Sequence, residues 1–280
     1  LPIVADVTMP ERVAEVFRQT QPDIVLHAAA HKHVPLMELN PKEAVRNNVW
    51  GTRVVAEAAL ASGVDRFVLI STDKAVNPSS VMGATKRIAE HVIQGLSQLG
   101  QTRFTVVRFG NVLGSNGSVV PLFAEQIRKG GPVTVTDPEI KRFFMAIPEA
   151  VQLVLQASVM GQGGEVFVLD MGEQIKIADL ARNMIVLSGF VPDKDIAIVY
   201  TGMRVGEKLY EELFEAGEQV MATAHAKINR AVGAPLLAED FERWIAELRS
   251  KLSDGDEEEL LQDLKRIVPT FQSTSPLRVS

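Results

Sequence analysis

A hydroxyl, a carboxylate and an amine stand together at the end of an apolar run in this chain. Thr72, Asp73 and Lys74 follow residues 66–70, Arg-Phe-Val-Leu-Ile, which have the composition of a buried parallel strand. In open α/β sheets, ligands bind and chemistry is done at the carboxyl ends of the strands. Because these residues leave a strand together, the sequence predicts a reactive site in which a hydroxyl, a carboxylate and an amine lie side by side.

Lys86 lies on the helix that we expect after this cluster. The turn at Asn77-Pro78 favours a helix start, and Ser79 or Ser80 can cap it. This spacing predicts one lysine beside a bound cofactor, with residues 72–74 beside the group that the cofactor attacks.

The elements around this site alternate as in a parallel sheet. We expect strands at residues 23–30, 66–70 and 104–109, and a long amphipathic helix that Asn40-Pro41 opens and Gly63 closes. Repeated strand-helix-strand units predict an α/β fold with a Rossmann-like doubly wound parallel sheet. The chain begins Leu1-Pro2 without Met and has no Gly-x-Gly-x-x-Gly turn, so we interpret it as a fragment whose first strands are missing.

Shorter elements follow Gly110. We expect strands at 133–136, 143–147, 165–170 and 196–200, and helices at 119–129, 148–159, 178–188, 206–214, 238–251 and 256–267. The acidic run 254–259 is interpreted as a helix first turn that complements the helix dipole.

Composition excludes several classes of protein. Across 280 residues the net charge is -6, and no basic stripe is present that would indicate a nucleic-acid partner. With 0 Cys there are no disulfides or thiolate metal sites, which suits a reducing compartment. No apolar run approaches the roughly 20 residues of a membrane span.

Seven motifs in order resemble one family. The chain looks like the nucleotide-sugar 4,6-dehydratases of the extended short-chain dehydrogenase/reductase superfamily. It is most similar to the membrane-anchored polysaccharide-biosynthesis branch that acts on UDP-N-acetylglucosamine, and the resemblance extends to about residue 235. The motifs are residues 27–34, 47–52, 71–75, 82–86, 108–114, 141–145 and 202–208.

The resemblance implies an NAD-binding domain and a substrate lobe. It assigns residues 1–113, with 146–171 returning to them, to a partial NAD-binding Rossmann domain. Residues 114–145 and 172–235 would form a smaller mixed α/β lobe that binds a UDP-sugar. Residues 236–280 would form a C-terminal helical tail. We further expect a homo-oligomer in the cytoplasm, or at the cytoplasmic face of the inner membrane if upstream helices anchor it.

In this family NAD takes hydride from C4 of the sugar and returns it to C6 after water is lost. The resemblance makes Asp73 the acid for O6 and Lys74 the base at C5, with Thr72 bonded to the developing C4 oxygen and Lys86 to the nicotinamide ribose. Most superfamily members have a tyrosine where this chain has Met82, and a thioether has no proton to exchange. The polysaccharide branch is similar in having Met there. The proton of the C4 hydroxyl would leave through Asp73 or a water.

For Lys74 to accept a proton near neutral pH, its pKa must fall by about three units from about 10.4. Burial and the Lys86 ammonium favour that fall, whereas an ionised Asp73 opposes it, so we treat the pair as one coupled titration. The alternative to a catalytic role for Asp73 and Lys74 is an ion pair at the protein surface.

The resemblance also names binding residues. Asp6 would bond the adenine amine, or merely cap the next helix. The remaining cofactor positions are Val7, Ala28, Ala29, Ala30 and Asn48, although the alanines could simply pack in the core. The UDP-sugar positions are His31, Lys32, Asn111, Arg142, Arg204 and Glu207. For the last four, the alternative is an inter-lobe salt bridge. We expect no metal at His27, His31 and His33.

Three alternatives stay open at this point. A UDP-sugar 4-epimerase would lack its usual base at Met82. A dehydratase that also inverts C5 is not excluded. A non-catalytic dinucleotide-binding protein would have no need of both the Asp73-Lys74 pair and the arginines.

Overall fold

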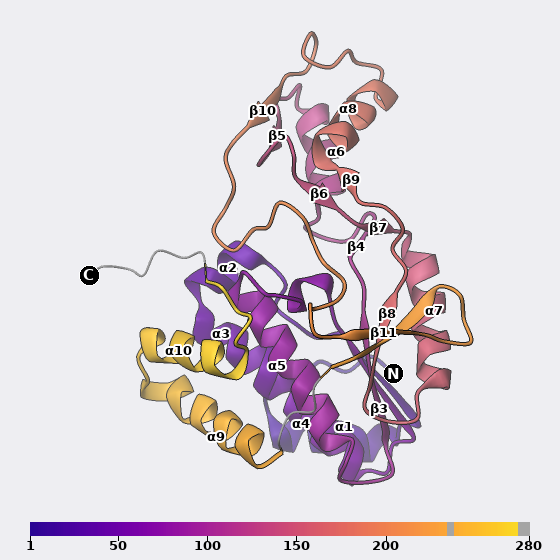
Figure 1. Ribbon diagram of the computed structural model, residues 1–280, viewed down its shortest axis with the longest axis vertical. Coiled ribbons are helices and arrows are strands. Elements are labelled where there is room, and N and C mark those ends of the chain that lie inside the picture. The colour runs from indigo at the N-terminus through magenta and orange to yellow at the C-terminus, as the bar shows by residue number, and fades with distance from the viewer. Residues whose placement is uncertain (234–237, 274–280) are drawn as a thin grey trace.

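A mostly parallel sheet of six strands forms the centre of the computed structural model, which describes residues 1–233 and 238–273. The strand order is β1-β2-β3-β8-β12-β11, and β1, β2, β3 and β8 run parallel (Figure 1). The strands are β1 Ile24–His27, β2 Arg66–Ile70, β3 Arg103–Arg108, β8 Glu165–Leu169, β12 Ile228–Val232 and β11 Gln219–Ala222. The sheet confirms the predicted Rossmann-like α/β class.

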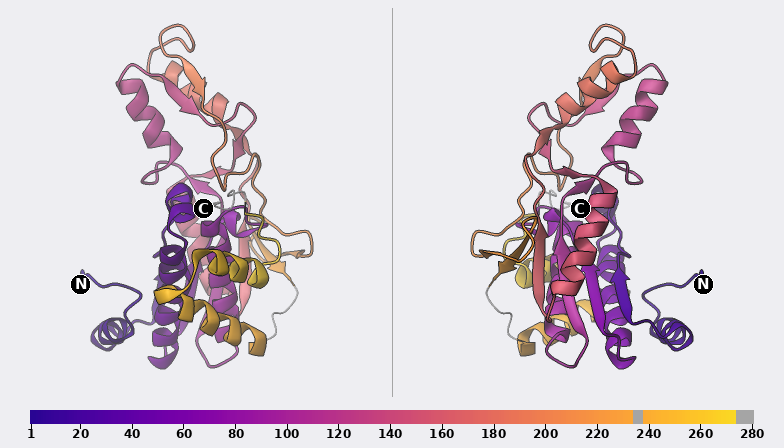
Figure 2. Two further views of the ribbon diagram at one scale, coloured as in Figure 1. Left: turned by 90° about the vertical axis from the view of Figure 1, so that its left-hand side faces the viewer. Right: turned by 90° about the vertical axis from the view of Figure 1, so that its right-hand side faces the viewer.

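Helices cover both faces of this sheet (Figure 2). Phe67 and Leu69 of β2 pack in one core cluster with α4 and α5, whereas Val68 between them packs in a second cluster with α7. Successive strand residues point to opposite faces, so this alternation shows that both faces are buried. The helices are α1 Pro10–Thr20, α4 Thr52–Ala61, α5 Val81–Leu96 and α7 Ile147–Met160.

The long helix predicted from Asn40-Pro41 to Gly63 is present in three parts. Helix α3 (Pro41–Ala44) continues as a π-helical segment, η1 (Val45–Gly51), and then as α4. The helix is followed by Gly63, whose φ of 68° suits glycine. The π segment is a feature that hydrophobic periodicity did not predict, and it carries Asn48.

The last two helices pack onto this body. Helices α9 (Ala238–Asp254) and α10 (Glu257–Ile267) contact α3, η1 and α5, and they bury Phe241, Leu248 and Leu264. Asp256 caps α10 by accepting from the Glu258 amide, so the acidic run begins a helix as predicted. The predicted boundary at 235/236 and residues 274–280 of the predicted tail lie outside the described residues.

A smaller lobe stands above the sheet in Figure 1 and has its own core, which includes Phe123, Val133 and Ile185. It contains α6 Val119–Arg128, β5 Val133–Val135, α8 Ile177–Leu187 and β10 Ile198–Tyr200. Short pairs join it to the body: β4 Asn111–Val112 with β7 Phe144–Met145, and β6 Lys141–Arg142 with β9 Ile175–Lys176. The remaining elements are α2 Val34–Leu39 and the single turn η2 Asp73–Ala75.

The predicted helix over 206–214 is wrong. Residues 201–218, which we call the 201–218 segment, form turns without a helix or strand. Its backbone carbonyls are used elsewhere: Gly206 O accepts from Ser79 Oγ, and Leu209 O accepts from the Lys141 amide. Carbonyls bonded in this way do not form a helical ladder, and tertiary contacts therefore decide the conformation.

The sequence reading also missed two strands. Strand β12 pairs antiparallel with β8, and β11 pairs with β12, so both extend the central sheet. Residues 219–232 therefore do not lie in the lobe that we predicted for 172–235. The remainder of the domain division stays a prediction.

Among the described residues, no helix has the length and apolar character that crossing a bilayer requires.

Candidate functional site

The turn after β2 carries the predicted acid and base. Beyond the strand, the Ser71 amide still donates to Val107 O at 2.8 Å and the Asp73 amide to Phe109 O at 3.1 Å. Thr72 then caps the turn η2, because its Oγ1 accepts from the Lys74 amide. The neighbouring strand therefore holds residues 71–74 rigidly at the carboxyl edge of the sheet, where they were predicted to lie.

Lys74 is surrounded by acceptors. Its Nζ donates to Asp73 Oδ1 at 2.9 Å and to Asn111 Oδ1 at 3.2 Å, and it lies 3.6 Å from Glu211 Oε1. Asp73 is fully buried, so Asp73 and Lys74 do not form the surface ion pair that was the alternative to a catalytic role. Asn111, predicted as a substrate residue, lies in this cluster.

The fall in the pKa of Lys74 that a neutral base requires is not found in the free protein. Burial lowers the pKa of this lysine, but the Asp73 and Glu211 carboxylates outweigh burial, so the pKa is raised above its usual value. The prediction allowed for one neighbouring carboxylate and not for two. Lys74 is therefore an ammonium ion in the free protein near neutral pH.

Glu211 is a residue of this site that sequence reasoning missed. It lies in the 201–218 segment, which was predicted to be a helix, and no local signal connects it to Lys74. Burial raises the pKa of Glu211 and the charge of Asp73 adds to the rise, whereas Lys74 and Arg142 oppose it. Within the described part of the chain, its Oε2 has no hydrogen-bond partner although it is buried.

Helix α5 packs directly against the back of the turn. Ser80 caps this helix by accepting from the Gly83 amide at 3.1 Å, which confirms Ser80 as one of the two predicted caps. A Cβ on Gly83 would lie only 2.2 Å from the Lys74 carbonyl oxygen. The absence of a side chain at Gly83 therefore allows α5 to support the turn that carries Lys74.

Met82 and Lys86 lie one helical turn apart on α5 and are both buried. Lys86 Nζ donates to Ile70 O, the last carbonyl of β2, at 2.8 Å. Burial lowers the pKa of Lys86 to about 8. Met82 is part of the apolar core. Contact of Lys86 with a cofactor ribose stays a prediction.

Asn48 holds the loop that follows β1. Its Oδ1 accepts from the His31 amide at 2.7 Å, and its Nδ2 donates to His31 O and to Thr85 Oγ1. The side chain is thus engaged within the protein, and its predicted contact with the cofactor is untested. Nearby, Ala28 is exposed and Ala29 and Ala30 are half-buried, so these alanines are not plain core.

The other residues of the N-terminal part differ in what they contact. Asp6 Oδ1 accepts from the amide and hydroxyl of Thr8 at 2.8 Å, and it does not cap α1, whose N-cap is Met9. The capping alternative for Asp6 is therefore wrong, and its adenine contact stays a prediction. Val7 packs against the position where Gly51 lacks a Cβ. Lys32 is exposed.

His27 does not face the loop that follows it. Its Nε2 lies 3.0 Å from Thr52 Oγ1 in the core, and burial lowers its pKa to about 4. No group of histidine, aspartate and glutamate side chains suited to a metal ion occurs in residues 1–233 and 238–273.

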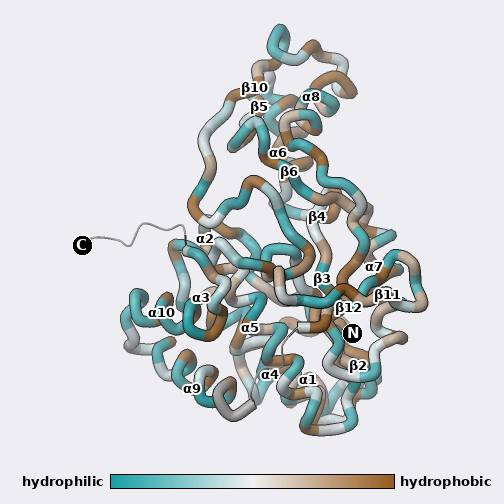
Figure 3. The backbone as a smooth tube through the Cα atoms, in the orientation of Figure 1, coloured by the Kyte–Doolittle hydropathy of each residue, from teal (hydrophilic) through white to brown (hydrophobic). Residues whose placement is uncertain are grey.

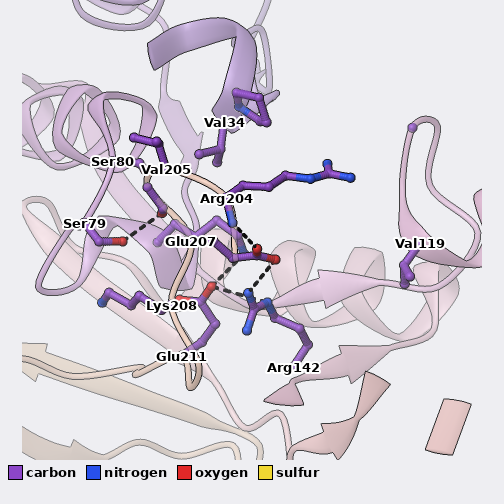
Figure 4. A pocket seen from close by; sticks show the side chains of 14 residues that line it. Val34, Ser79, Ser80, Val119, Arg142, Arg204, Val205, Glu207, Lys208 and Glu211 are labelled. Atoms are coloured by element: carbon purple, nitrogen blue, oxygen red, sulfur yellow. Dashed lines mark hydrogen bonds and ion pairs between the residues drawn. The ribbon is translucent and has the colours of Figure 1, made fainter. Parts of the chain in front are cut away.

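A pocket of about 260 Å³ opens beside Lys74, between the sheet and the smaller lobe. Figure 4 shows Val34 of α2 above it and Arg142 below, with the Arg204 side chain extended between them. Arg142 Nη2 lies 3.5 Å from Glu207 Oε1, so these two predicted substrate residues form the ion pair that was their alternative. The structure thus brings Lys74 and both arginines to one cavity.

A buried ion network ties the site to the 201–218 segment. Arg108 of β3 is fully buried and donates to both oxygens of Glu90 and of Glu218. Glu90 Oε1 also accepts from Ser71 Oγ at 2.5 Å, immediately before the reactive turn. Despite burial, the paired arginines hold the pKa of Glu90 down to about 2. The sequence offered no sign of this network.

Comparison with known proteins places the chain in a family. Residues 1–232 match the sequence profile of the family described as polysaccharide biosynthesis protein. The chain belongs to this family, which confirms the predicted branch.

Curated relatives include several enzymes. The capsular polysaccharide biosynthesis protein CapD of Staphylococcus aureus is 60% identical over 82% of this chain and 38% of its own length. The UDP-N-acetylglucosamine 4,6-dehydratase (inverting) of Campylobacter jejuni is 36% identical over 77% of this chain and 62% of its own. The UDP-glucose 4-epimerase of Rickettsia typhi is 38% identical over 71% of this chain and 58% of its own length. The chain spans less than half the length of CapD.

Solved structures share the fold. The X-ray structure of Pen from Bacillus thuringiensis is 34% identical, with a TM-score of 0.76 over 88% of this chain and 81% of that one. A double mutant of DesIV, a dTDP-glucose 4,6-dehydratase from Streptomyces venezuelae with NAD and DAU bound, has a TM-score of 0.66 at 20% identity. The matched region covers 75% of this chain and 69% of the DesIV chain.

Proposed function

We propose that this chain carries the catalytic site of an NAD-dependent 4,6-dehydratase that acts on a UDP-N-acetylhexosamine, namely UDP-N-acetylglucosamine. The observation that carries the proposal is the contact of 2.9 Å between Lys74 Nζ and Asp73 Oδ1, at a strand end that opens into a pocket containing two arginines. The dehydratase among the relatives supports the reaction class.

The pocket suits a nucleotide sugar. Arg204 and Arg142 supply forked donors of the kind that bind a diphosphate, and Lys74 and Asn111 supply polar groups for the sugar. The Glu207 carboxylate accepts hydrogen bonds from the Arg204 amide and the Thr136 hydroxyl, and these contacts fix its position. The fixed carboxylate in turn pairs with Arg142 and holds that side chain in place. We propose that the arginine side chains bind the diphosphate, while the sugar extends toward Lys74.

The residues at the strand ends fit a dinucleotide. Ala28 to Ala30 leave the β1 end partly open to approach, and Lys86 holds a buried ammonium beside the β2 end. NAD, when bound there, supplies the acceptor for the C4 hydride and its return to C6. The NAD bound in the DesIV structure supports this part of the proposal.

Lys74 and Asp73 would move the protons of the elimination. Oxidation at C4 makes the C5 proton acidic, and neutral Lys74 removes it. Protonated Asp73 gives its proton to O6, the C6–O6 bond breaks and water leaves. Because the two groups are already hydrogen-bonded and are held by the β2 turn, they need no rearrangement to act as a pair.

Replacing Lys74 by alanine tests this assignment. Water loss should stop, because the base is gone, while binding of the nucleotide sugar should remain near the wild-type level. Product analysis by NMR with UDP-N-acetylglucosamine reports the 4-keto-6-deoxy sugar, and solvent deuterium at C5 reports the deprotonation. Unchanged turnover in the Lys74→Ala protein would remove Lys74 from this role.

The epimerase among the relatives keeps a second candidate open. A 4-epimerase returns hydride to C4, and its product keeps the C6 hydroxyl, so the same NMR spectrum separates the two reactions. Met82 has no proton to exchange and therefore favours the dehydratase. The configuration at C5, which the spectrum also reports, decides whether the product is inverted. If the protein converts no UDP-hexosamine in this experiment, the result would favour a non-catalytic role in dinucleotide binding.

A further inference from the structure

Lys74 has one proton too many for the reaction proposed above. In the free protein it is an ammonium ion between two carboxylates, with its pKa raised. A base at C5 must be neutral before it acts. Met82 has no proton to exchange, so the proton of the C4 hydroxyl leaves through Asp73 or a water. On the route through Asp73, that carboxyl is already protonated and cannot also take the lysine proton. A third group is needed to hold the proton of Lys74.

Glu211 stands where such a group must be. Its Oε1 lies 3.6 Å from Lys74 Nζ, so a movement of roughly 1 Å or less brings the two into hydrogen-bond distance. The carboxyl is buried, and its Oε2 has no hydrogen-bond partner among the described residues. A buried carboxyl with an unused oxygen is well placed to accept and keep a proton.

The backbone around Glu211 is firmly held. The Glu211 amide donates to Gln174 Oε1 at 3.3 Å, and Gln174 Nε2 donates to the Glu211 carbonyl at 2.9 Å. Lys208 Nζ donates to Val76 O, immediately after the reactive turn. These contacts position the carboxyl against Lys74 although the 201–218 segment has no regular structure.

The charges that face Glu211 favour transfer of one proton. Lys74 and Arg142, each 3.6 Å from Oε1, stabilise its ionised form, as does Lys208 more weakly. Burial and the Asp73 carboxylate stabilise its protonated form. When Asp73 becomes neutral, Lys74 loses its closest counter-ion, so its ammonium is less stabilised at that moment.

We propose that Glu211 is a positioning residue that takes the proton of Lys74 during the reaction and returns it afterwards. This inference rests on the proposed dehydratase function. It deepens that function by completing its proton balance with residues of this chain.

The balance closes over one cycle. Asp73 takes the O4 proton as hydride leaves C4 for NAD, and Lys74 gives its proton to Glu211. Neutral Lys74 then removes the C5 proton, Asp73 protonates O6, and water leaves. Hydride returns to C6, Lys74 returns a proton to C5, and Glu211 returns its proton to Lys74. The protein ends as it began.

The test uses Glu211→Gln, which keeps the size of the side chain but cannot take a proton. In the intact protein we expect oxidation at C4, followed by nicotinamide absorbance on mixing, to persist. Deuterium exchange at C5 should fall by about 100-fold at neutral pH. Exchange should recover as pH rises, because solvent then removes the proton of Lys74. Glu211→Asp, which keeps the carboxyl, should restore part of the neutral rate.

Glu212→Gln is the matched control. Glu212 is the next residue of the same segment, and it is half exposed and pairs with Lys208 and Asn77 instead of Lys74. This variant should match the wild type in both partial reactions.

A second readout needs neither substrate nor cofactor. Only a neutral amine reacts with an acylating reagent, and peptide mass spectrometry can follow Lys74 alone. Without the Glu211 charge, the pH at which Lys74 becomes reactive should fall by about one to three units. Equal labelling profiles and equal C5 exchange in Glu211→Gln and wild type would overturn the inference. Loss of C4 oxidation together with C5 exchange at every pH would also overturn it, because that pattern is structural. A wild-type protein without either partial reaction would instead refute the dehydratase function, and labelling would still test the pairing.

Discussion

Replacing Gly83 by alanine should damage the proposed site without removing any of its chemical groups. Gly83 lies in the first turn of α5, where the helix meets the carbonyl of Lys74. An added Cβ would lie 2.2 Å from that oxygen, whereas ordinary contacts begin near 3.4 Å. The helix and the turn must therefore separate by about 1 Å, and the turn that carries Lys74 must move.

The size of the effect follows from two opposing contributions. Alanine favours a helix over glycine by about 0.5 to 1 kcal/mol. Overpacking of a tight contact costs about 1 to 3 kcal/mol, so Gly83→Ala should be destabilising overall. Displacing a catalytic group by 1 Å can reduce the rate by about 100-fold, so activity should fall further than stability alone predicts.

Gly95 offers the matched control within the same helix. A Cβ there would meet only Phe241, at 3.8 Å, which is an ordinary contact. Gly95→Ala should therefore be neutral or slightly stabilising and fully active. Urea unfolding measures stability, and C5 deuterium exchange measures the site. If Gly83→Ala proved as stable and as active as Gly95→Ala, the close packing of α5 on the turn would be refuted.

Three further outcomes are expected. Met82→Leu should keep most activity whereas Lys86→Ala should lose it, because Met82 only packs and Lys86 is proposed to hold the cofactor; equal damage in steady-state kinetics would contradict this view. Arg108→Met should cost about 3 to 5 kcal/mol in urea unfolding at neutral pH, since Glu90 loses its main counter-ion in the core; a change under about 1 kcal/mol would show that the pair is not needed. His27 binds its proton in the folded protein only near pH 4, against an ordinary pKa of 6.5, so its contribution to stability is complete above 6.5 and is lost as pH falls. That pKa shift corresponds to a loss of about 3 kcal/mol in the free energy of unfolding between pH 6.5 and 4. The His27→Gln protein should lose about that much less stability over the same pH range. An unchanged dependence of the free energy of unfolding on pH would exclude His27 as the cause of the loss.

Local signals account for what could be predicted of the fold. The apolar run at residues 66–70 and the helix after Asn77-Pro78 depend on neighbouring residues, and both are present as expected. Ser80 caps α5 because a side-chain oxygen can reach the first free amides of its own helix. Such contacts lie within a few residues, and a sequence shows them directly.

Contacts between distant parts of the chain account for what was missed. The 201–218 segment has polar and apolar residues at helical spacing, but its carbonyls bond to residues elsewhere in the fold, including Ser79 and Lys141. Strands β11 and β12 exist because β8 offers them a free edge. Pairing of this kind depends on which segments meet, and periodicity does not show it.

The sequence by itself determined which side chains could be the acid and the base, because Asp73 and Lys74 are adjacent and follow one strand. It determined the family as well, through motifs whose order is visible in one dimension. Only the tertiary structure decided the protonation of Lys74. Glu211 comes from a segment far along the chain, and at 3.6 Å from Lys74 its carboxylate adds to the stronger effect of Asp73, so that the pKa of the lysine is raised despite burial. The pKa of a buried group is set by the charges around it in space, and folding alone brings those charges together.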